Sequence, residues 1–286
     1  MCLFEPRMQI VATARAALEA ELKTAVREQQ FVLHYQSQVD VRGAITGAET
    51  LIRWEHPALG LVSPDAFIPM AEETGLIVPL GRWVLRTACE QLALWSTQPQ
   101  MAAITLSINV SACEFGHAEF VDGVLSVLEE TGADPSRLKL ELTESLLVYD
   151  IEDLGVKMET LKAAGVGFSL DDFGTGYSSL SRLKRLPLDQ LKIDRNFIRN
   201  LLVDSKDVAV TRMVIALGES MGLNVIAEGV DSEEQRNALE QMGCFSYQGY
   251  LFSRPVPLLE FEGMIGRTPE SRTGPDSAVA AGRFVN

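Results

Sequence analysis

The chain has 286 residues, of which 47% are hydrophobic and 22% are charged. This composition is that of a globular protein with a large core, and it excludes collagen, a coiled coil and a wholly disordered chain. Lys and Arg number 25 against 39 Asp and Glu, so the formal net charge is −14. Because a field of this sign repels a phosphate backbone, we expect no polymeric nucleic acid as a partner. Bound cations could still reverse the sign locally for a small phosphorylated ligand.

Cysteine and histidine spacings indicate neither a zinc site nor a disulfide framework. The four cysteines are far apart in the sequence, and the three histidines lack metal-ligand spacing. The first residues do not read as a signal peptide, and no run approaches the roughly 18 apolar residues of a membrane helix. We therefore expect free thiols, a cytoplasmic location and no membrane span in this sequence, although a longer protein containing it could be membrane-anchored.

The hydrophobic pattern predicts one hairpin followed by alternating helices and strands. Residues 8–29 carry apolar side chains at helical spacing, and the runs 31–39 and 48–54 flank a Gly-containing turn, which predicts an antiparallel hairpin. Further helices are predicted at 64–73, 78–96, 117–131, 152–164, 178–184, 206–221 and 232–241. Further strands are predicted at 104–110, 138–143, 166–170, 190–194, 224–229 and 244–250.

This alternation predicts a parallel sheet with helices outside it. Eight strands within about 250 residues favour a closed (β/α)₈ barrel over an open doubly wound sheet. The Gly-Thr-Gly at 174–176 lacks the third glycine of a dinucleotide-binding fingerprint. Residues 268–286 are small and polar without a period, which is typical of a disordered tail.

Polar side chains recur where the predicted strands end, the position at which barrels of this kind hold their chemistry. They are Glu49, Arg53, Asn109, Glu141, Glu144, Asp171, Asp172, Lys192, Asp194, Glu228 and Gln248. Any one of them alone is more simply a cap or a surface residue. Five of these carboxylates at one mouth, however, would raise one another's pKa unless cations were present: Glu49, Glu141, Asp171, Asp172 and Glu228.

The charges at this mouth indicate metal ions. Two divalent cations and Lys192 would together balance five carboxylates, and Arg53 could face an anionic substrate. Oxygen ligands suit Mg²⁺ or Mn²⁺, and two such ions about 3.5–4 Å apart form the usual clamp for phosphodiester hydrolysis. The residues alone thus predict a two-metal phosphohydrolase. The segment 171–180 is either an ordinary strand-to-helix loop or a loop whose glycines bend both aspartates toward metals.

Eight ordered blocks of the sequence resemble the EAL-domain phosphodiesterases, a family that hydrolyses the bacterial second messenger cyclic di-GMP. They are AETLIRWEHP (48–57), FIPMAEETGLI (67–77), INVSA (108–112), LELTES (140–145), DDFGTGYSSL (171–180), LKIDRNFI (191–198), AEGVD (227–231) and QGYLFSRPVP (248–257). The resemblance covers about residues 28–266. It implies an α/β fold, a modified (β/α)₈ TIM-type barrel whose first strand is antiparallel to the others.

The resemblance also implies two Mg²⁺ or Mn²⁺ ions per active site and in-line attack of a metal-bound water, giving linear pGpG. One ion would be held by Glu49, Asn109, Glu141 and Asp171, and the other by Asp171, Asp172 and Glu228. The implied catalytic residues are Lys192, Glu228 and Glu49. The implied substrate contacts are Gln36, Arg53 and Gln248. Glu144 matches a carboxylate that anchors the loop 171–180.

Three positions depart from the family pattern. Thr50 replaces the alanine of the Glu-Ala-Leu signature, Ser37 replaces a proline, and Asp231 replaces a glutamate. Because the metal ligand of the signature is the glutamate, we expect Thr50 to be tolerated. Ser37 is expected to loosen the backbone on the ligand side, and the shorter Asp231 to weaken the second metal site.

The alternative to an enzyme is an EAL barrel that binds cyclic di-GMP as a receptor without hydrolysing it. Degenerate relatives lose metal ligands, and none is missing here, so we favour the enzyme. The resemblance further implies a homodimer paired through helices near the fifth and sixth strands. We interpret residues 1–27 as a helix that links the barrel, 28–267, to an upstream GGDEF or sensor domain. The alternative is an intrinsic helix that closes the bottom of the barrel.

Overall fold

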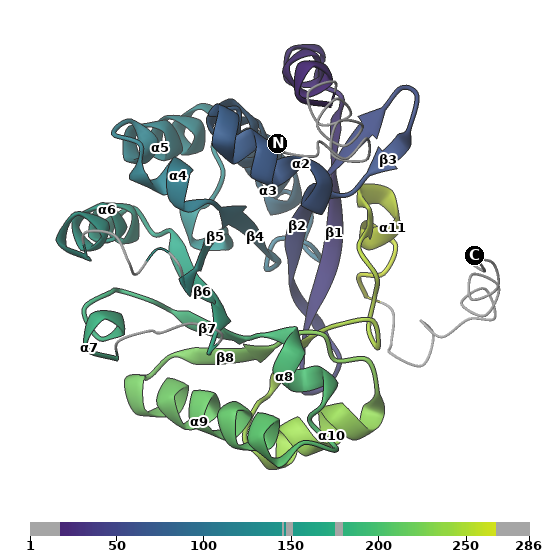
Figure 1. Cartoon of the computed structure of the whole chain (residues 1–286), viewed down its shortest axis with the longest axis vertical. Helices are drawn as coiled ribbons and strands as arrows, with labels where there is room; N and C mark the ends of the chain where they lie inside the picture. The colour runs from purple at the N-terminus through teal and green to yellow at the C-terminus, as the bar shows by residue number, and fades with distance from the viewer. Residues whose placement is uncertain (1–17, 145, 147–150, 175–179, 267–286) are drawn as a thin grey trace, which may run out of the picture.

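The computed structural model describes residues 18–144, 146, 151–174 and 180–266. Its strands are β1 (Phe31–Asp40), β2 (Ile45–His56), β3 (Gly60–Val62), β4 (Thr105–Val110), β5 (Leu138–Thr143), β6 (Gly167–Phe173), β7 (Gln190–Ile193), β8 (Asn224–Ala227), β9 (Ser246–Gln248) and β10 (Val256–Pro257). They form one sheet in the order β10-β1-β9-β8-β7-β6-β5-β4-β2-β3. Because β1 also pairs with β2, eight strands close into a barrel (Figure 1).

The first strand of the barrel runs against its neighbours. β1 is antiparallel to both β2 and β9, whereas the pairs from β2–β4 round to β8–β9 are parallel. In this register Gln36 lies opposite Glu49 and Gln38 lies opposite Gln248. The structure therefore confirms the predicted modified (β/α)₈ barrel, including its antiparallel first strand and the hairpin.

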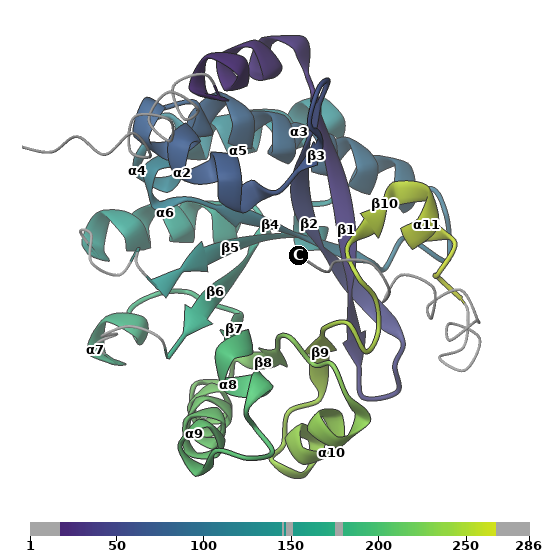
Figure 2. The same ribbon diagram turned by 45° about the vertical axis from the view of Figure 1, so that its right-hand side comes forward.

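Helices surround the barrel (Figures 1 and 2). They are α2 (Pro64–Thr74), α3 (Ile77–Ser96), α4 (Ala112–Gly116), α5 (Phe120–Thr131), α6 (Ile151–Ala163), α7 (Leu180–Leu183), α8 (Arg195–Arg199), α9 (Ser205–Met221), α10 (Glu233–Gln241) and α11 (Leu258–Glu262), with a 3₁₀ turn at Pro135–Arg137. None of the described helices combines the length and the apolar composition needed to cross a bilayer.

The main apolar core lies between the strands and these helices. Because successive side chains of a strand face opposite sides, every second side chain points into the barrel instead. On β5, for example, Leu140 and Leu142 belong to the apolar core, and Glu141 between them is 1% exposed. The same alternation on β4 and β6 places Ser107 and Ser169, both fully buried, inside the barrel. The barrel interior therefore contains polar side chains at these positions, which can form hydrogen bonds to charged groups inside it.

A second apolar core lies beside the carboxyl end of β2. Residues 18–28 are helical, and Leu22 of this helix packs in the same cluster as Trp54 of β2 and Phe67 of α2. His56, the last residue of β2, lies 2.9 Å from the Glu21 carboxylate through its Nε2 atom. The helix is thus at the carboxyl end of β2, not at the bottom of the barrel. The predicted residues 8–17 lie outside the described part of the chain.

The structure corrects several predicted elements. The helix expected at 117–131 begins later, at Phe120, as α5, because the chain turns at 117–119. The short helix α4 before it was not predicted, and Ser111 and Glu114 form a reciprocal capping box at its start. Asp194 was assigned to a strand, but its carboxylate accepts a hydrogen bond from Asn196 N and caps α8, which the sequence did not predict. The short elements β3, β10 and α11 were also missed.

Candidate active site

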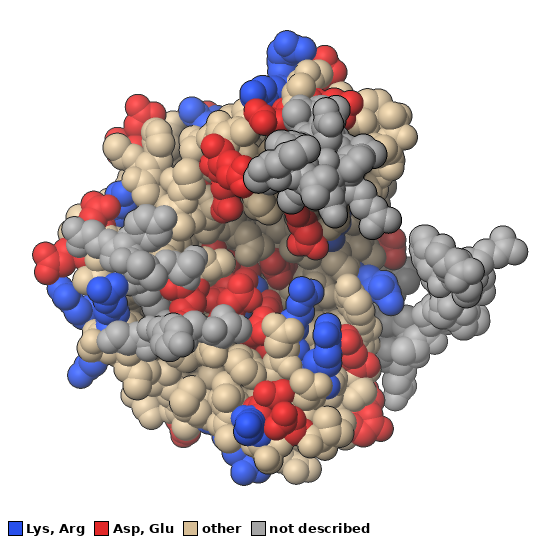
Figure 3. Space-filling view, in the orientation of Figure 1, with Lys and Arg blue, Asp and Glu red and all other residues tan. Residues whose placement is uncertain are grey.

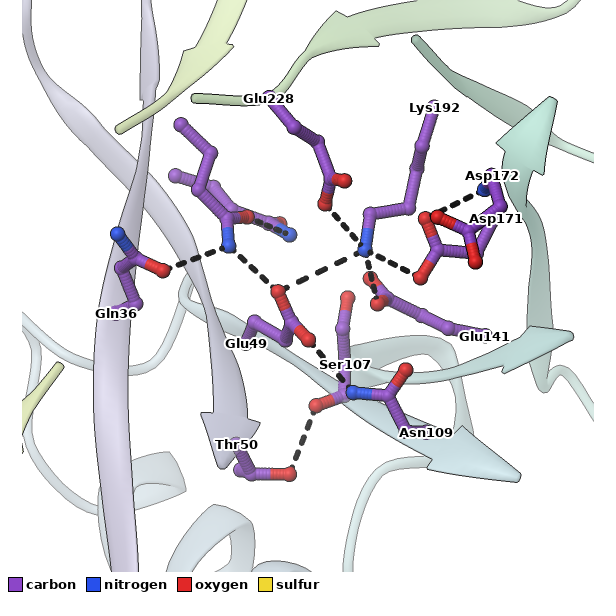
Figure 4. Close-up of polar contacts among 12 residues, drawn as sticks. Gln36, Glu49, Thr50, Ser107, Asn109, Glu141, Asp171, Asp172, Lys192 and Glu228 are labelled. Carbon is purple, nitrogen blue, oxygen red and sulfur yellow. Dashed lines mark hydrogen bonds and ion pairs between the residues drawn. The ribbon is translucent and has the colours of Figure 1, made fainter. Parts of the chain in front are cut away.

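The centre of the site is the ammonium group of Lys192, which four carboxylates from different strand ends surround (Figure 4). Lys192 is fully buried. Its Nζ atom lies 2.5 Å from Glu141 Oε2, 2.6 Å from Glu228 Oε1, 3.3 Å from Asp171 Oδ2 and 3.6 Å from Glu49 Oε2. The barrel thus brings together β2, β5, β6, β7 and the end of β8 at one point.

Side-chain amides hold Glu49 from two directions. Asn109 Nδ2 donates to Glu49 Oε1 at 2.6 Å, and Gln248 Nε2 donates to Glu49 Oε2 at 2.5 Å. Gln248 Nε2 also donates to Gln36 Oε1, and Gln38 Nε2 donates to Gln248 Oε1, both at 3.1 Å. The sequence analysis missed Gln38. Strand alternation could have found it, because a side chain two residues after Gln36 faces the same side of β1.

The two adjacent aspartates at the end of β6 are separated by a backbone bend. The register of β6 against β7 shifts between Leu170 and Phe173, and Asp172 has φ +56°, in the left-handed region that aspartate tolerates better than most residues. Asp171 Oδ1 accepts a hydrogen bond from Asp172 N at 2.9 Å. The backbone therefore bends at Asp172 itself, where the sequence had suggested only the glycine turn, and Gly174 at the start of that turn also has a positive φ, +99°. Residues 175–179 of this turn lie outside the described residues.

Glu144 contacts the beginning of the loop at 171–180. Gly174 N donates a hydrogen bond to Glu144 Oε2 at 3.1 Å. Gly174 has φ +99°, and a Cβ atom there would lie 3.1 Å from the ring of Phe197. A side chain at this position would be strained in its backbone and crowded by α8.

Burial and the neighbouring charges shift the pKa values of the groups in the site. Burial raises the pKa of Glu141 to about 7, and Lys192 only partly offsets this. Burial also raises the pKa of Glu228 well above its usual range, and burial together with Asp171 and Asp194 raises that of Asp172 to about 6. Burial alone would lower the pKa of Lys192, but the carboxylates around it, Asp171 foremost, raise it well above its usual range. Lys192 therefore stays protonated, and the cluster keeps an excess of negative charge that binding of cations would relieve.

Arg53 lies outside the network around Lys192. Its guanidinium is half-buried and donates to the backbone oxygen of Ile52 at 2.8 Å. Burial lowers its pKa, opposed by Tyr250, Glu49 and Asp65. On the surface, acidic side chains gather at the centre of one face, with basic side chains beside them (Figure 3).

The donor set fits divalent metal ions. Glu141 Oε1 is a buried carboxylate oxygen without a hydrogen-bond partner, which is costly unless a further group binds it. Carboxylate and amide oxygens are the ligands that Mg²⁺ and Mn²⁺ prefer. Among the described residues no three His, Cys, Asp or Glu side chains have the mutual arrangement that holds a metal ion. In this structure the carboxylates of Glu141 and Glu228 lie 2.5 and 2.6 Å from Lys192 Nζ (Figure 4).

Comparison with known proteins identifies the family. The model of the EAL domain matches residues 19–255, most of the chain, so this chain belongs to the EAL-domain family. The predicted resemblance is confirmed.

Individual relatives agree with this assignment. The chain is 47% identical over 257 residues to the bifunctional diguanylate cyclase/cyclic di-GMP phosphodiesterase MucR of Pseudomonas aeruginosa, covering 90% of this chain and 37% of that protein. It is 41% identical over 260 residues to the cyclic di-GMP phosphodiesterase NbdA of the same organism, covering 91% and 33%. A solved structure of the PaMucR phosphodiesterase in complex with c-di-GMP superposes with a TM-score of 0.83 at 47% identity, covering 86% of this chain and 99% of that chain. The chain spans about a third of the length of these two curated relatives.

Proposed function

We propose that this chain hydrolyses cyclic di-GMP to linear pGpG with the help of two divalent cations. The observation that carries the proposal is the convergence of Glu141, Glu228, Asp171 and Glu49 on Lys192, with one oxygen of Glu141 left without a partner. We infer the substrate, cyclic di-GMP, from the names of the relatives. We infer the reaction class, phosphodiester hydrolysis assisted by metal ions, from the carboxylates at the mouth of the barrel.

The resemblance to the EAL family supplies the metal ligands of this proposal. Glu49, Asn109, Glu141 and Asp171 would hold one cation, and Asp171, Asp172 and Glu228 the other. When bound, the two cations polarise the phosphodiester and lower the pKa of a water molecule. Asn109 and Gln248 fix the two oxygens of Glu49 from opposite sides, which limits the directions in which that ligand can turn.

The chain's own residues complete the chemistry. Lys192 keeps its proton, and its ammonium group could donate a hydrogen bond to the reacting phosphate or to the attacking water. Glu228, 2.6 Å from Lys192, can hold the proton that the attacking water loses. Gln36, Arg53 and Gln248 would orient the substrate, and Glu144 would hold the beginning of the 171–180 loop.

The test is a hydrolysis assay with the purified chain, cyclic di-GMP and Mg²⁺ or Mn²⁺, with the product separated by chromatography. We expect pGpG to accumulate over many turnovers. Saturable binding of cyclic di-GMP without pGpG would assign the chain to the receptor alternative instead.

We also propose a homodimer that pairs through the helices that follow β6 and β7. Three large apolar side chains are exposed there, Leu202 at 53%, Val203 at 85% and Met213 at 54%. An exposed apolar group of this kind is typical of an interface. Sedimentation of the wild type and of Val203→Asp tests this, because only the wild type should form dimers.

The greater length of the relatives supports a further domain in the full-length protein. We propose that the helix at 18–28 connects this barrel to a GGDEF or sensor domain in the full-length protein. Its contact with the second apolar core near β2 gives such a domain a direct mechanical connection to the strand that carries Glu49.

A further inference from the structure

The interior of the barrel contains two buried serines below the carboxylates. Ser107 on β4 and Ser169 on β6 are both fully buried. The residues before and after each of them belong to the main apolar core outside the barrel, so both hydroxyls face inward. Each serine precedes a proposed metal ligand of its own strand by two residues, Asn109 on β4 and Asp171 on β6. The two serines therefore lie deeper in the barrel than these ligands.

The two serines stand on either side of Glu141. β4 and β6 are the neighbours of β5, which carries Glu141, and Ser169 is the register partner of Glu141. Ser107 is the register partner of Glu49. Because barrels of this type fill their interior with layers drawn from alternate strands, the two serines share one layer, just below the layer that holds Glu141 and Lys192. Figure 4 shows the Ser107 side chain pointing from β4 toward the carboxylates above it.

Three buried oxygens in this part of the barrel are unpartnered. Within the part of the chain that the structure describes, Ser107 Oγ, Ser169 Oγ and Glu141 Oε1 accept and donate no hydrogen bond. They come from three adjacent strands and face the same interior space. Burying such an oxygen without a partner is unfavourable, and buried polar atoms in native proteins nearly always have one. The arrangement therefore indicates one small partner that all three oxygens share.

The surroundings limit what this partner can be. Ile226, which is 1% exposed and belongs to neither apolar core, comes from β8 and closes the same layer on the far side. Lys192 lies in the layer above, and Lys139, the register partner of Ser107 on β5, lies in the layer below. A cation between two ammonium groups would be repelled by both. A water molecule is neutral, can both donate and accept, and typically bonds about three buried polar groups.

A water at this position is compatible with a cation on Glu141. The other oxygen of Glu141, Oε2, lies 2.5 Å from Lys192 Nζ. Each carboxylate oxygen has two acceptor positions, so Oε1 can accept from a water below and still face a cation above. The water would then hold the carboxylate from beneath and restrict its rotation. A ligand fixed in this way binds a metal ion more tightly, because less freedom is lost on binding.

We propose that Ser107 Oγ, Ser169 Oγ and Glu141 Oε1 bind one buried water molecule, and that the two serines are positioning residues that hold Glu141 as a metal ligand through this water. The proposal rests on the proposed function. It assigns a role in metal affinity to two side chains that would not touch the cations, the substrate or the attacking water.

The experiment measures binding of Mn²⁺ and of Mg²⁺ to the metal-free chain by calorimetry, without cyclic di-GMP. The variants are Ser107→Ala, Ser169→Ala and the double variant. Thr211→Val is the matched control, because Thr211 is fully buried and its Oγ1 is likewise unpartnered among the described residues, but it lies on α9 outside the barrel. We expect each serine variant to weaken metal binding about tenfold, the lower end of what loss of an outer partner costs. Thr211→Val should bind as the wild type does.

The double variant tests whether one water is shared. Two serines that hold the same water lose the same interaction, so the double variant should bind metal about as weakly as the weaker single variant. If the serines acted separately, their losses would multiply to about a hundredfold. Multiplied losses would therefore overturn the shared water.

Urea denaturation in EDTA gives a readout that needs no metal. Removing a hydroxyl that binds a buried water should lower the urea midpoint. Removing a hydroxyl that has no partner should raise it, because an unpaired polar group is then taken out of the interior. Higher midpoints in Ser107→Ala and Ser169→Ala would overturn the water site.

The outcomes separate this site from the proposed hydrolysis. Metal affinities of both serine variants equal to that of Thr211→Val would overturn the positioning role, even in an active enzyme. The expected losses of metal affinity in a chain that produces no pGpG would overturn hydrolysis and support the site. A wild-type chain that binds neither ion would overturn the two-cation function together with the positioning role, and the urea midpoints would then decide whether the water is bound.

Discussion

The hydroxyl of Thr50 donates a hydrogen bond to the backbone oxygen of Ser107 at 2.9 Å, across the parallel pair β2–β4. Thr50 is 3% exposed and directly follows Glu49. The alanine of the family signature could not form this bond. The departure thus adds a connection between the strand that carries Glu49 and the strand that carries Asn109.

This bond predicts a measurable contribution to stability. Thr50→Val, which keeps the shape and removes the hydroxyl, should lower the free energy of unfolding by about 1 kcal/mol in urea denaturation. Thr50→Ser, which keeps the hydroxyl, serves as the control for the bond itself. A Thr50→Val chain as stable as the wild type would show that the bond contributes nothing.

Metal ions should be required for hydrolysis. We expect activity with Mg²⁺ or Mn²⁺, none in excess EDTA, and inhibition by Ca²⁺, because the smaller ions impose the near-octahedral geometry that in-line attack needs. The initial rate of pGpG formation at fixed ionic strength measures this. Full turnover in excess EDTA would contradict the two-cation proposal.

Single ligand substitutions should abolish the reaction without unfolding the chain. Glu49→Ala and Asp172→Asn each remove a charged oxygen ligand and little apolar packing, so pGpG formation should fall by at least about 100-fold. Their far-ultraviolet circular dichroism should match that of the wild type. Near wild-type rates in both variants would mean that the ligands are misassigned.

Lys192 should stabilise the metal-free protein. Lys192→Met leaves the surrounding carboxylates without their cation, and breaking a buried ion pair in this way costs about 3–5 kcal/mol. Urea denaturation in EDTA measures the loss, and added Mg²⁺ should recover part of it. Lys139→Met is the control, because Lys139 Nζ bonds the neutral Gln190 at 2.9 Å and feels Glu141 and Asp189 only through longer-range electrostatics, without a direct ion pair to the carboxylates around Lys192. Equal losses would contradict this role of Lys192.

Stability without metal should fall as pH rises. Burial raises the pKa of Glu141 and of Glu114 to about 7, well above their usual 4.5. The folded chain therefore binds these protons more tightly than the unfolded chain does. The stabilising effect is complete below the unfolded pKa and is lost as pH rises through the folded value, so the free energy of unfolding in EDTA should decrease from about pH 5 to about pH 8. Glu114→Gln should flatten this slope, and a slope of the opposite sign would contradict the assignment.

The sequence predicted the barrel because its signals are local and repeated. Strand composition and helix periodicity recur along the chain, and the parallel topology then places the strand ends together. Glu49, Glu141, Asp171 and Glu228 could be expected at one mouth for this reason alone. Their contact with Lys192 could be predicted only with the register of the strands, because a shift of one residue would turn each side chain to the opposite face of the sheet.

The contacts of residues 249–254, which follow β9, could not be predicted in the same way. The hydroxyl oxygens of Ser37 and Ser253 lie 2.7 Å apart, but the two residues are more than 200 positions apart in the sequence, and neither has a pattern that indicates the other. Ser37 therefore adds a contact where a looser backbone was expected. Asp231 was expected to act near the second metal because Glu228 is close in the sequence, but its carboxylate contacts Tyr250 N. The short elements were missed for a related reason. A helix of five residues such as α8 depends on the Asp194 cap, and a single aspartate after a strand is ambiguous.

The left-handed backbone at Asp172 limits how this barrel could evolve. Asparagine and glycine tolerate that conformation, whereas most other residues would cost roughly 1–2 kcal/mol in the backbone alone. Asparagine would remove the charge while keeping both the size of the side chain and the bend. If the chain hydrolyses cyclic di-GMP as proposed, asparagine at this position would remove turnover at little cost to the fold. Relatives that bind cyclic di-GMP without hydrolysing it should then carry asparagine or glycine there more often than alanine.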